Sequence, residues 1–355
     1  MRILAMGGRF LLVVGCAYGT TACEAIEEEN AWSLSVTGDT IAVIGSLDGP
    51  DHEMFGRLIA VGAHEDHGLF LLDLQRGGIF WYGFDGAFRD ALLQRGEGPG
   101  DLATPWDVHI DQEGLWVLDR GNSRISQFAL QEGDGMRHVR SKPGVFRDGN
   151  ICRLGEWMLL GGLGNGYTLH ALDHEGEVTR SMGPAPEVAG AMEFGAWLPL
   201  VESQLIRGRV YCADDEGMVV VAASAHPLVR AFDEGGVLLW EAELPGIHSI
   251  RFFVTPRGSL ESEPDPETGA HFLRSMTRWG EETLLLQYEI RMPGEVPDDQ
   301  EFHGIDSRLI DLGSGEELAR SQDLPLIHAR AGNHLILMDN LPSPRVTVLE
   351  LRDME

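Results

Sequence analysis

The chain has 355 residues, of which 43% are hydrophobic, so it can build one large all-β domain or two smaller domains. Its 27 basic residues (Lys and Arg) stand against 56 acidic ones (Asp and Glu), which gives a formal net charge of −29. This balance argues against nucleic-acid partners and against adhesion to anionic lipid, because both need basic surfaces. Solubility explains the acidic surplus most simply, and attraction of cations or of a basic partner is the alternative.

Residues 1–23 have the order of a secretory signal. Arg2 and Arg9 give the segment a positive start, the short apolar run at 10–14 follows, and small residues come after it. The apolar run is too short to span a bilayer as a mature helix. We therefore predict a signal peptide at 1–23 and export of the mature chain into a bacterial cell envelope.

Two cysteines near the end of this segment are candidates for lipidation. Cys16 follows Val-Val-Gly, which resembles a bacterial lipobox, whereas Cys23 follows Ala22 in a poorer match that leaves a more usual signal length. We expect a periplasmic or membrane-anchored lipoprotein with its lipid on Cys16 or Cys23, and residues 24–31 as an acidic tether. The membrane is then a partner only through this anchor, and cleavage without a lipid is the alternative.

From residue 32 onward the chain repeats a unit of short apolar strands separated by polar turns. In each unit a candidate first strand precedes a strongly apolar second strand, and these second strands begin at Leu69, Leu115, Trp157, Met218, Leu284 and Leu335. Their content of branched and aromatic residues is typical of strands, and the 45 glycines suit a chain with many turns. Sustained helical periodicity is scarce, so we expect short helices only within 186–201 and 266–280.

Units of four strands that repeat at roughly 40–50 residues predict an all-β fold, the β-propeller, with four-stranded antiparallel blades. The sixth unit ends after three strands, and an unpaired candidate strand at 32–47 precedes the first unit. If this N-terminal strand completes the last blade, the ring closes with six blades and hides its sheet edges. We therefore predict one propeller domain at 32–355, with an enlarged fifth blade at 247–325.

The second unit carries a family resemblance. Residues 96–128 resemble an NHL-type repeat, whose pattern is matched by Pro105, Asp111, Gly114, Trp116, Asp119, Gly121, Asn122, Arg124 and Phe128. The lead-ins at 44–56 and 95–102 are similar to those of exported bacterial six-bladed propellers, often lipoproteins of unknown role. The resemblance implies the architecture and leaves the activity open, because such propellers include binders, scaffolds and enzymes.

The polar residues of this unit form a structural turn in the family. Asp119 and Asn122 can hydrogen-bond turn amides, and the pair Gly121-Asn122 can adopt positive φ. Arg124 can pair with Asp119 across the hairpin or reach the neighbouring blade. We therefore interpret this cluster as a turn of one blade and look for the functional site elsewhere.

Propeller ligands usually bind at the mouth of the central channel, which the innermost strands line. We place these six strands at 57–63, 105–111, 150–155, 208–214, 249–254 and 327–332. Polar residues on or beside them make up the candidate ligand-binding set, which comprises Asp107, His109, Arg153, His248, Arg251 and His328.

Histidines on different inner strands could together hold a metal such as zinc, and similar propellers with lyase activity use channel histidines in this way. The spacing does not favour it here, because strand alternation sends His109 and His328 to opposite faces unless a bulge intervenes. The acidic runs 261–267 and 297–301 lack the ordered spacing of a calcium loop, so we interpret them as solvated loops. We expect no cofactor, with calcium or zinc in the channel as the alternative.

Two other groups of residues invite a structural and a functional interpretation. Cys152 and Cys212 could form a disulfide in an exported protein, although two separate buried thiols are the favoured interpretation. Phe194, Trp197 and Trp279 lie in segments expected to be loops, where aromatic side chains can anchor a partner. Packing of these aromatic side chains onto a sheet edge is the more common outcome.

The resulting hypothesis is an exported, monomeric propeller that binds a protein or small ligand through loops at the channel mouth. The alternative from another class is a metal-dependent lyase or hydrolase with its site in the channel. Catalysis is the less favoured of the two, because the chain has no Gly-x-Ser-x-Gly, no phosphate loop and no His-Glu-x-x-His. A purely structural module of a surface complex is a third possibility.

Overall fold

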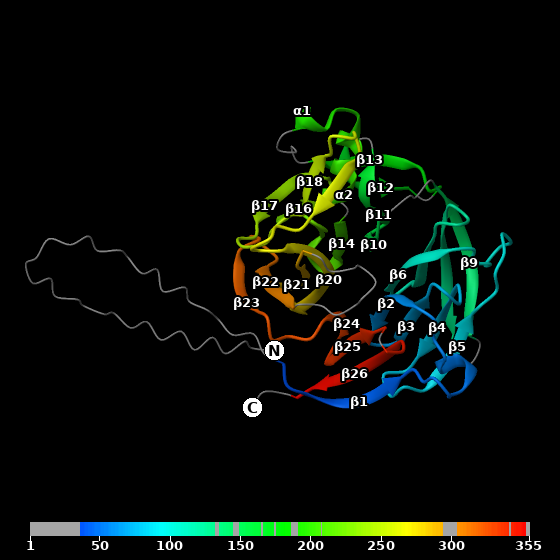
Figure 1. Ribbon diagram of the computed structural model, residues 1–355. Helices are drawn as coiled ribbons and strands as arrows, with labels where there is room; N and C mark the ends of the chain where they lie inside the picture. Colours follow the sequence, from blue (N-terminus) through cyan, green and yellow to red (C-terminus); the bar gives the residue numbers. More distant parts are fainter. Residues whose placement is uncertain are drawn as a thin grey trace, which may run out of the picture.

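Six four-stranded antiparallel sheets stand in a ring as the blades of a β-propeller, which confirms the predicted fold (Figure 1). The computed structural model describes residues 36–131, 135–144, 149–164, 166–173, 175–185, 191–206, 208–293, 304–340 and 342–352. The predicted signal peptide, the acidic tether and both candidate lipidation sites, Cys16 and Cys23, lie outside these residues.

The first five blades each consist of four strands that follow one another in the chain. Blade 1 contains β2 (Leu58–His64), β3 (Gly68–Asp73), β4 (Gly78–Tyr82) and β5 (Phe88–Leu92). Blade 2 contains β6 (Pro105–Asp111), β7 (Gly114–Asp119), β8 (Arg124–Gln131) and β9 (Gly135–Pro143). Blade 3 contains β10 (Ile151–Leu154), β11 (Trp157–Gly164), β12 (Tyr167–Leu172) and β13 (Val178–Pro184).

Blade 4 contains β14 (Gly208–Ala213), β15 (Met218–Ala223), β16 (Leu228–Asp233) and β17 (Leu238–Glu243). Blade 5 contains β20 (Ala270–Gly280), β21 (Thr283–Arg291), β22 (Ile305–Asp311) and β23 (Glu317–Ser321). Two insertions interrupt this pattern. The first holds α1 (Ala191–Phe194), a 3-10 turn (Gly195–Trp197) and α2 (Leu198–Ile206), and the second is a hairpin of β18 (Arg251–Val254) and β19 (Leu260–Glu263). Two further 3-10 turns lie at Asp51–Glu53 and Asp214–Glu216.

Blade 6 joins the two ends of the chain. It contains β24 (Ile327–Ala331), β25 (His334–Asp339) and β26 (Arg345–Leu351), and its outer strand is β1 (Gly38–Ile44). The strands β1 and β26 pair antiparallel, from Gly38 opposite Leu351 to Ile44 opposite Val346. The N-terminal strand therefore closes the ring, as the count of strands predicted.

The innermost strands β2, β6, β10, β14, β20 and β24 contact one another in a closed ring. The prediction was right for five of them and wrong for the fifth, which is β20 rather than 249–254. The latter segment contains β18, which pairs with β19 alone. The predicted helix at 266–280 is also wrong, because β20 alternates between buried and partly exposed residues along its length, which is the periodicity of a strand. The helical expectation for 186–201 is met by α1 and α2.

Six apolar clusters fill the six interfaces between neighbouring blades. In β7, Leu115 and Val117 pack toward blade 1, whereas Trp116 and Leu118 pack toward blade 3. Every residue of β7 is buried because a sheet stacks on each side of it. Burial of one such apolar side chain contributes roughly 1.5–3 kcal/mol, so the ring is held mainly by these interfaces.

A disulfide joins Cys152 on β10 to Cys212 on β14, which corrects the expectation of two separate thiols. The two cysteines lie on the facing sides of neighbouring inner strands, with their Cα atoms 5.7 Å apart. This separation is within the range that a disulfide bridges without movement of the backbone. The disulfide therefore links blades 3 and 4 at their inner edge.

A repeated aspartate at the end of the second strand fixes the connection between blades. Asp119 is fully buried, and its carboxylate accepts hydrogen bonds from the backbone N–H groups of Ala103 at 3.0 Å and Thr104 at 2.8 Å. Asn122 donates to the same carboxylate at 2.8 Å. Asp73 accepts from two backbone N–H groups of its own preceding loop in the same way.

Arg124 follows the second of its two expected roles, because its side chain reaches toward the neighbouring blade rather than to the Asp119 carboxylate. Its guanidinium donates instead to the backbone carbonyls of Glu97, Gly98 and Asp101, in the loop that joins blades 1 and 2. Asp119 thus accepts hydrogen bonds from this connection while Arg124 donates to it.

We expect Asp119→Ala to lower the free energy of unfolding by about 3 kcal/mol, because it leaves two backbone N–H groups without their charged acceptor. Urea-induced unfolding measures this loss. Asp339→Ala is the matched control, since Asp339 is half-exposed and pairs with Arg345 only at 3.6 Å, so its loss should stay below about 1 kcal/mol. Equal losses for the two variants would contradict this role of the repeated aspartate.

Candidate functional site

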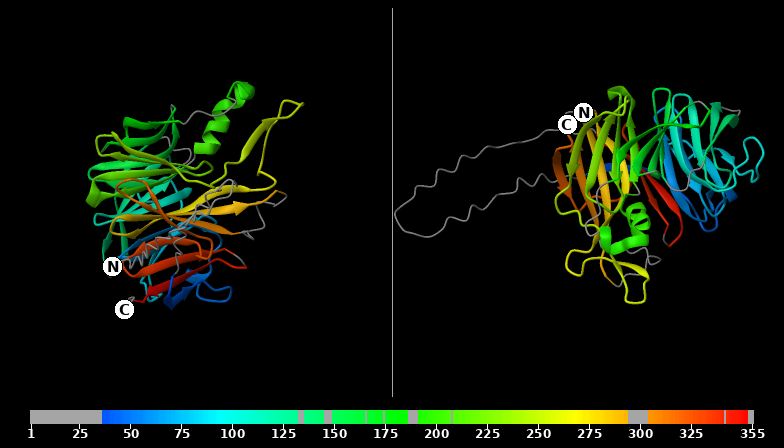
Figure 2. Two further views of the ribbon diagram at one scale, coloured as in Figure 1. Left: turned by 90° about the vertical axis from the view of Figure 1, so that its left-hand side faces the viewer. Right: turned by 90° about the horizontal axis from the view of Figure 1, so that it is seen from above.

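Both insertions stand on the same side of the ring, at the face where the inner strands begin. The helical insertion immediately precedes β14 and the β18–β19 hairpin precedes β20. Figure 2 shows α2 and the hairpin projecting together from this side. We call it the insertion face. None of the helices in the described part of the chain has the length and apolar composition needed to cross a membrane.

A pocket of about 380 Å³ lies between the two insertions. Its wall is apolar for the most part, with a few polar groups, and it is lined by Leu200, Gln204, Ser224, Ala225, Ile250, Phe252, Leu260, Glu261, Ser262 and Phe272. Val201 of α2 is fully buried against hydrophobic residues of the hairpin. The Trp197 Nε1–H donates to the carbonyl oxygen of Gly258 at 3.2 Å, which joins the helical insertion to the tip of the hairpin.

The aromatic residues proposed as anchors have different positions. Trp197 is 39% exposed on the insertion, whereas Phe194 packs with the small core beneath it. Trp279 is 7% exposed and belongs to β20, where it packs between blades 5 and 6. The expectation that Trp279 lies in a loop was wrong, because the segment that holds it is a buried strand.

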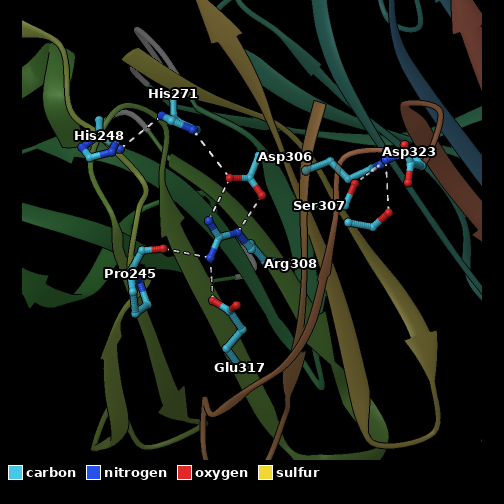
Figure 3. Close-up of polar contacts among 10 residues, drawn as sticks. Pro245, His248, His271, Asp306, Ser307, Arg308, Glu317 and Asp323 are labelled. Carbon is cyan, nitrogen blue, oxygen red and sulfur yellow. Dashed lines mark hydrogen bonds and ion pairs between the residues drawn. The ribbon is translucent and has the colours of Figure 1, made fainter. Parts of the chain in front are cut away.

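A buried polar network anchors the base of the hairpin (Figure 3). His271 on β20 donates its backbone N–H to the carbonyl of His248 at 2.8 Å, and its Nδ1 accepts from the His248 N–H at 3.2 Å. The other ring nitrogen of His271 is 3.6 Å from the carboxylate of Asp306 on β22. His248 is therefore part of the hairpin base and does not lie on an inner strand, which corrects its predicted position.

Arg308 completes this network from the same strand as Asp306. It donates to both carboxylate oxygens of Asp306, at 2.7 and 2.8 Å, and to Glu317 and the carbonyl of Pro245, each at 2.8 Å. Burial alone would raise the pKa of Asp306, but His271 and Arg308 outweigh it and hold the pKa below its usual value. The charged form of Asp306 is thus kept inside the fold, and the hairpin stands on a fixed base.

Arg251 lies on β18 rather than on an inner strand, which corrects its predicted position as well. Its side chain is half-exposed and pairs with Glu263 of β19 at 2.6 Å. Within the acidic run at 261–267, Asp265 accepts hydrogen bonds from the backbone N–H groups of Glu267 and Thr268, as a turn residue does. The other acidic run, 297–301, lies outside the described residues.

Near the opposite face, His109 lies beside a group of charged residues contributed by blades 2 and 3. Arg153 of β10 pairs with Asp111 at 2.8 Å and with Glu113 at 2.6 Å. The Nε2 of His109 is 3.8 Å from the same Asp111 carboxylate. Burial lowers the pKa of His109 to about 4, even though Asp111 opposes the shift. His109 and Arg153, both predicted site residues, are thus neighbours in an ion-pair group that joins two blades.

Closer to the insertion face, a second group of polar residues lies on the inner strands. The Asp107 carboxylate accepts a hydrogen bond from the Ile151 N–H at 2.8 Å, and burial raises its pKa to about 6. His328 accepts a hydrogen bond at Nδ1 from the Met338 N–H at 3.1 Å. Burial, together with Arg209 and Arg274, lowers the pKa of His328 to about 3.

The structure therefore brings Asp107 and His328 toward a common region and adds two arginines that the sequence analysis missed. Arg209 was within the correctly predicted strand 208–214 but was not selected. Arg274 was missed because its strand was expected to be a helix, although period-two alternation across 270–280 was visible. Among the described residues, no three His, Cys, Asp or Glu side chains lie close enough together to hold a metal ion.

Comparisons with known proteins identify the fold and no family. No protein-family model matches the chain, and no curated protein does. A solved member of the DUF4221 family from Bacteroides vulgatus is similar with a TM-score of 0.58 and 9% identity, over 90% of this chain and 98% of that one. A candidate exported protein from Bacteroides fragilis has a TM-score of 0.55 at 9% identity, over 90% and 98% of the two chains.

The WD40 domain of Pan2 from Neurospora crassa is a third similar structure. Its TM-score is 0.51 at 9% identity, over 91% of this chain and 98% of that domain. Propellers from bacteria and from a fungus are thus similar at equally low identity, so these matches concern the fold alone.

We expect His328 to make the protein less stable as the pH falls below about 6.5. The folded protein keeps this imidazole neutral down to about pH 3, whereas the unfolded chain takes up the proton near pH 6.5. The unfolded state thus binds one more proton here, and the free energy of unfolding drops by up to about 1.4 kcal/mol per pH unit. His328→Asn removes this contribution, so its stability should fall less steeply than the wild-type stability between pH 6.5 and 4.5. Parallel pH profiles from urea unfolding would contradict the neutral state of His328.

Proposed function

We propose that this protein is an exported binding protein, and that its ligand docks on the insertion face, in the pocket between α2 and the β18–β19 hairpin. The observation that carries the proposal is that residues from both insertions, α2 and the β18–β19 hairpin, line one pocket. A regular propeller needs neither insertion, and long additions to a regular scaffold are where specificity is usually placed. The NHL-like second unit fits this proposal, because it serves the scaffold and leaves recognition to the loops.

The chemistry of the pocket supports a ligand with an apolar body. Its volume of about 380 Å³ is within the usual range for small-molecule sites. Leu200, Phe252 and Phe272 offer apolar surface, whereas Gln204 and Glu261 offer polar contacts. Because Glu261 brings a carboxylate, a ligand with an amine or hydroxyl group next to an apolar body fits this lining best. An exposed side chain of a partner protein that combines an apolar body with an amine or hydroxyl group fits this lining in the same way.

Three observations support export. Residues 1–23 have the order of a secretory signal. The disulfide between Cys152 and Cys212 suits an oxidising compartment outside the cytoplasm. One similar structure is named as a candidate exported protein. We propose a monomer held in the bacterial cell envelope by a lipid on Cys16 or Cys23.

A fragment screen tests the proposed pocket. We expect small aromatic amines to bind the purified domain by ligand-observed NMR, and Phe252→Ala or Leu200→Ala to weaken that binding at least five-fold. The control is Val43→Ala, because Val43 is 59% exposed on β1 of blade 6, outside the pocket lining. Aromatic amines that bind the Phe252→Ala variant as well as the wild type would refute the pocket as the binding site.

Metabolic labelling tests the anchor separately. We expect the full-length chain to incorporate radiolabelled palmitate in a bacterial host and to fractionate with membranes. Either Cys16→Ser or Cys23→Ser should abolish both properties, and the other single variant is the built-in control. If the double variant still fractionates with membranes, the lipid-anchor proposal is wrong, whereas the pocket proposal is unaffected.

A further inference from the structure

The β18–β19 hairpin keeps an open strand edge beside the pocket. Its two strands pair with each other and with no third strand among the described residues. β18 also contacts α1, whereas Leu260, Glu261 and Ser262 of β19 line the pocket, and the last two of them are exposed. The edge of a sheet carries backbone N–H and C=O groups without ladder partners, so it is a template for another strand. The open edge of β19 thus adjoins the pocket.

The register of the hairpin shows which backbone groups of β19 point outward. The Thr255 N–H donates to the carbonyl of Ser259 at 2.8 Å, so this pair is a hydrogen-bonded position. Hydrogen-bonded and non-hydrogen-bonded pairs alternate along an antiparallel ladder, so the next pair, Val254 with Leu260, is non-hydrogen-bonded. Ser262 has the same status two residues further along. The N–H and C=O groups of Leu260 and Ser262 therefore point away from β18, and in the described part of the chain no turn or loop backbone pairs with them.

The charge of the two insertions indicates what kind of strand fits this edge. Residues 191–206 and 248–269 together contain six carboxylates and two arginines. Two of the carboxylates, Glu261 and Glu263, belong to β19 itself. A second copy of this chain would bring the same carboxylates to the edge, and like charges on neighbouring strands are destabilising. A strand with basic side chains is favoured by its charge.

We propose that an extended basic segment of a partner protein adds to the open edge of β19 as an antiparallel strand. Such strand addition gains affinity from backbone hydrogen bonds, while alternate side chains give specificity. The segment residues opposite Leu260 and Ser262 direct apolar side chains toward the pocket. The residues between them stand beside Glu261 and Glu263, where lysine or arginine is favoured. This inference rests on the proposed function, because it uses the same pocket and names its ligand as a polypeptide.

Calorimetric titration of the purified protein with synthetic peptides tests this mode of binding. The reference peptide is Lys-Val-Lys-Phe-Lys-Val-Lys with both ends blocked, and we expect a dissociation constant of about 0.1 mM or lower. The same peptide with glutamate in place of each lysine should bind at least ten-fold more weakly, because its charge has the sign of the edge. Equal binding of the two peptides, or no binding of the reference peptide, overturns the proposal.

Methylation of backbone nitrogens separates strand addition from charge attraction alone. In an antiparallel pair the N–H groups of the two valines face β19, whereas those of the two lysines next to phenylalanine face away. Methyl groups on the two valine nitrogens should therefore weaken binding at least ten-fold. Methyl groups on the two lysine nitrogens are the matched control and should change it less than two-fold. If both methylated peptides bind alike, no strand is added to β19.

Two proline variants of the protein make the same comparison from the other side. Ser262→Pro removes an N–H group that points to the added strand, whereas Val254→Pro removes one at the opposite edge of the same hairpin. Proline is compatible with edge positions whose N–H lies outside the ladder. We expect Ser262→Pro to weaken the reference peptide at least ten-fold and Val254→Pro less than two-fold. Equal effects of the two variants contradict the assignment of the edge.

The small aromatic amines distinguish this inference from the proposed function. If they bind the pocket and the reference peptide does not bind, the pocket remains a ligand site and strand addition is wrong. If neither binds, the pocket proposal fails as well. Sedimentation of the protein alone tests the other occupant, because a dimer that Ser262→Pro dissociates would place a second copy of this chain on the edge and overturn the proposal.

Discussion

The structure depends on the packing of apolar side chains between neighbouring blades. Each blade buries one face against the blade before it and the other against the blade after it, and six separate clusters result. Because neighbouring blades cover both faces of a blade, its middle strands can be buried throughout, as in β3 and β15, where every residue is buried. Polar side chains lie on the inner strands, in the turns and in the two insertions, and some also lie within a blade, as Asp306 and Arg308 do on β22.

Within those regions, charged groups mostly serve to join elements. Arg153 connects blades 2 and 3, and Arg278 of blade 5 pairs with Asp215 and Glu216 of blade 4. Arg308 and Asp306 hold the base of the hairpin.

The fold was largely predictable from the sequence because its determinants are local and repeated. The second strand of each blade is a short apolar run followed by a turn, and Asp119 with its neighbours marks that turn without ambiguity. The fifth inner strand was not predictable by the same means. The apolar residues of β18 do form a strand at the expected place, but it pairs with β19 outside the ring. The true inner strand, β20, carries His271, Arg274 and Arg278 within its alternating pattern.

The site was less predictable than the fold. Which polar residues of an inner strand reach the axis depends on bulges, and bulges arise from the pairing of strands rather than from residue type. His328 was selected for its chemistry and Arg274 was overlooked, although the same kind of bulge displaces both. The disulfide was uncertain for a similar reason, because the approach of Cys152 to Cys212 is set by the stacking of two blades.

Closure by the N-terminal strand has a consequence for the order in which the molecule can assemble. Gly38 and Leu351 are partners at opposite ends of the described chain, so the last blade cannot form until β26 has been synthesised. Contacts of such long range slow folding, and intermediates that await them expose apolar surface. Until β26 arrives, the side of blade 1 that holds Leu69, Leu71 and Phe80 has no neighbour to cover it. The nascent protein therefore passes through an open arc of blades, and loss of the final strand would leave it in that state.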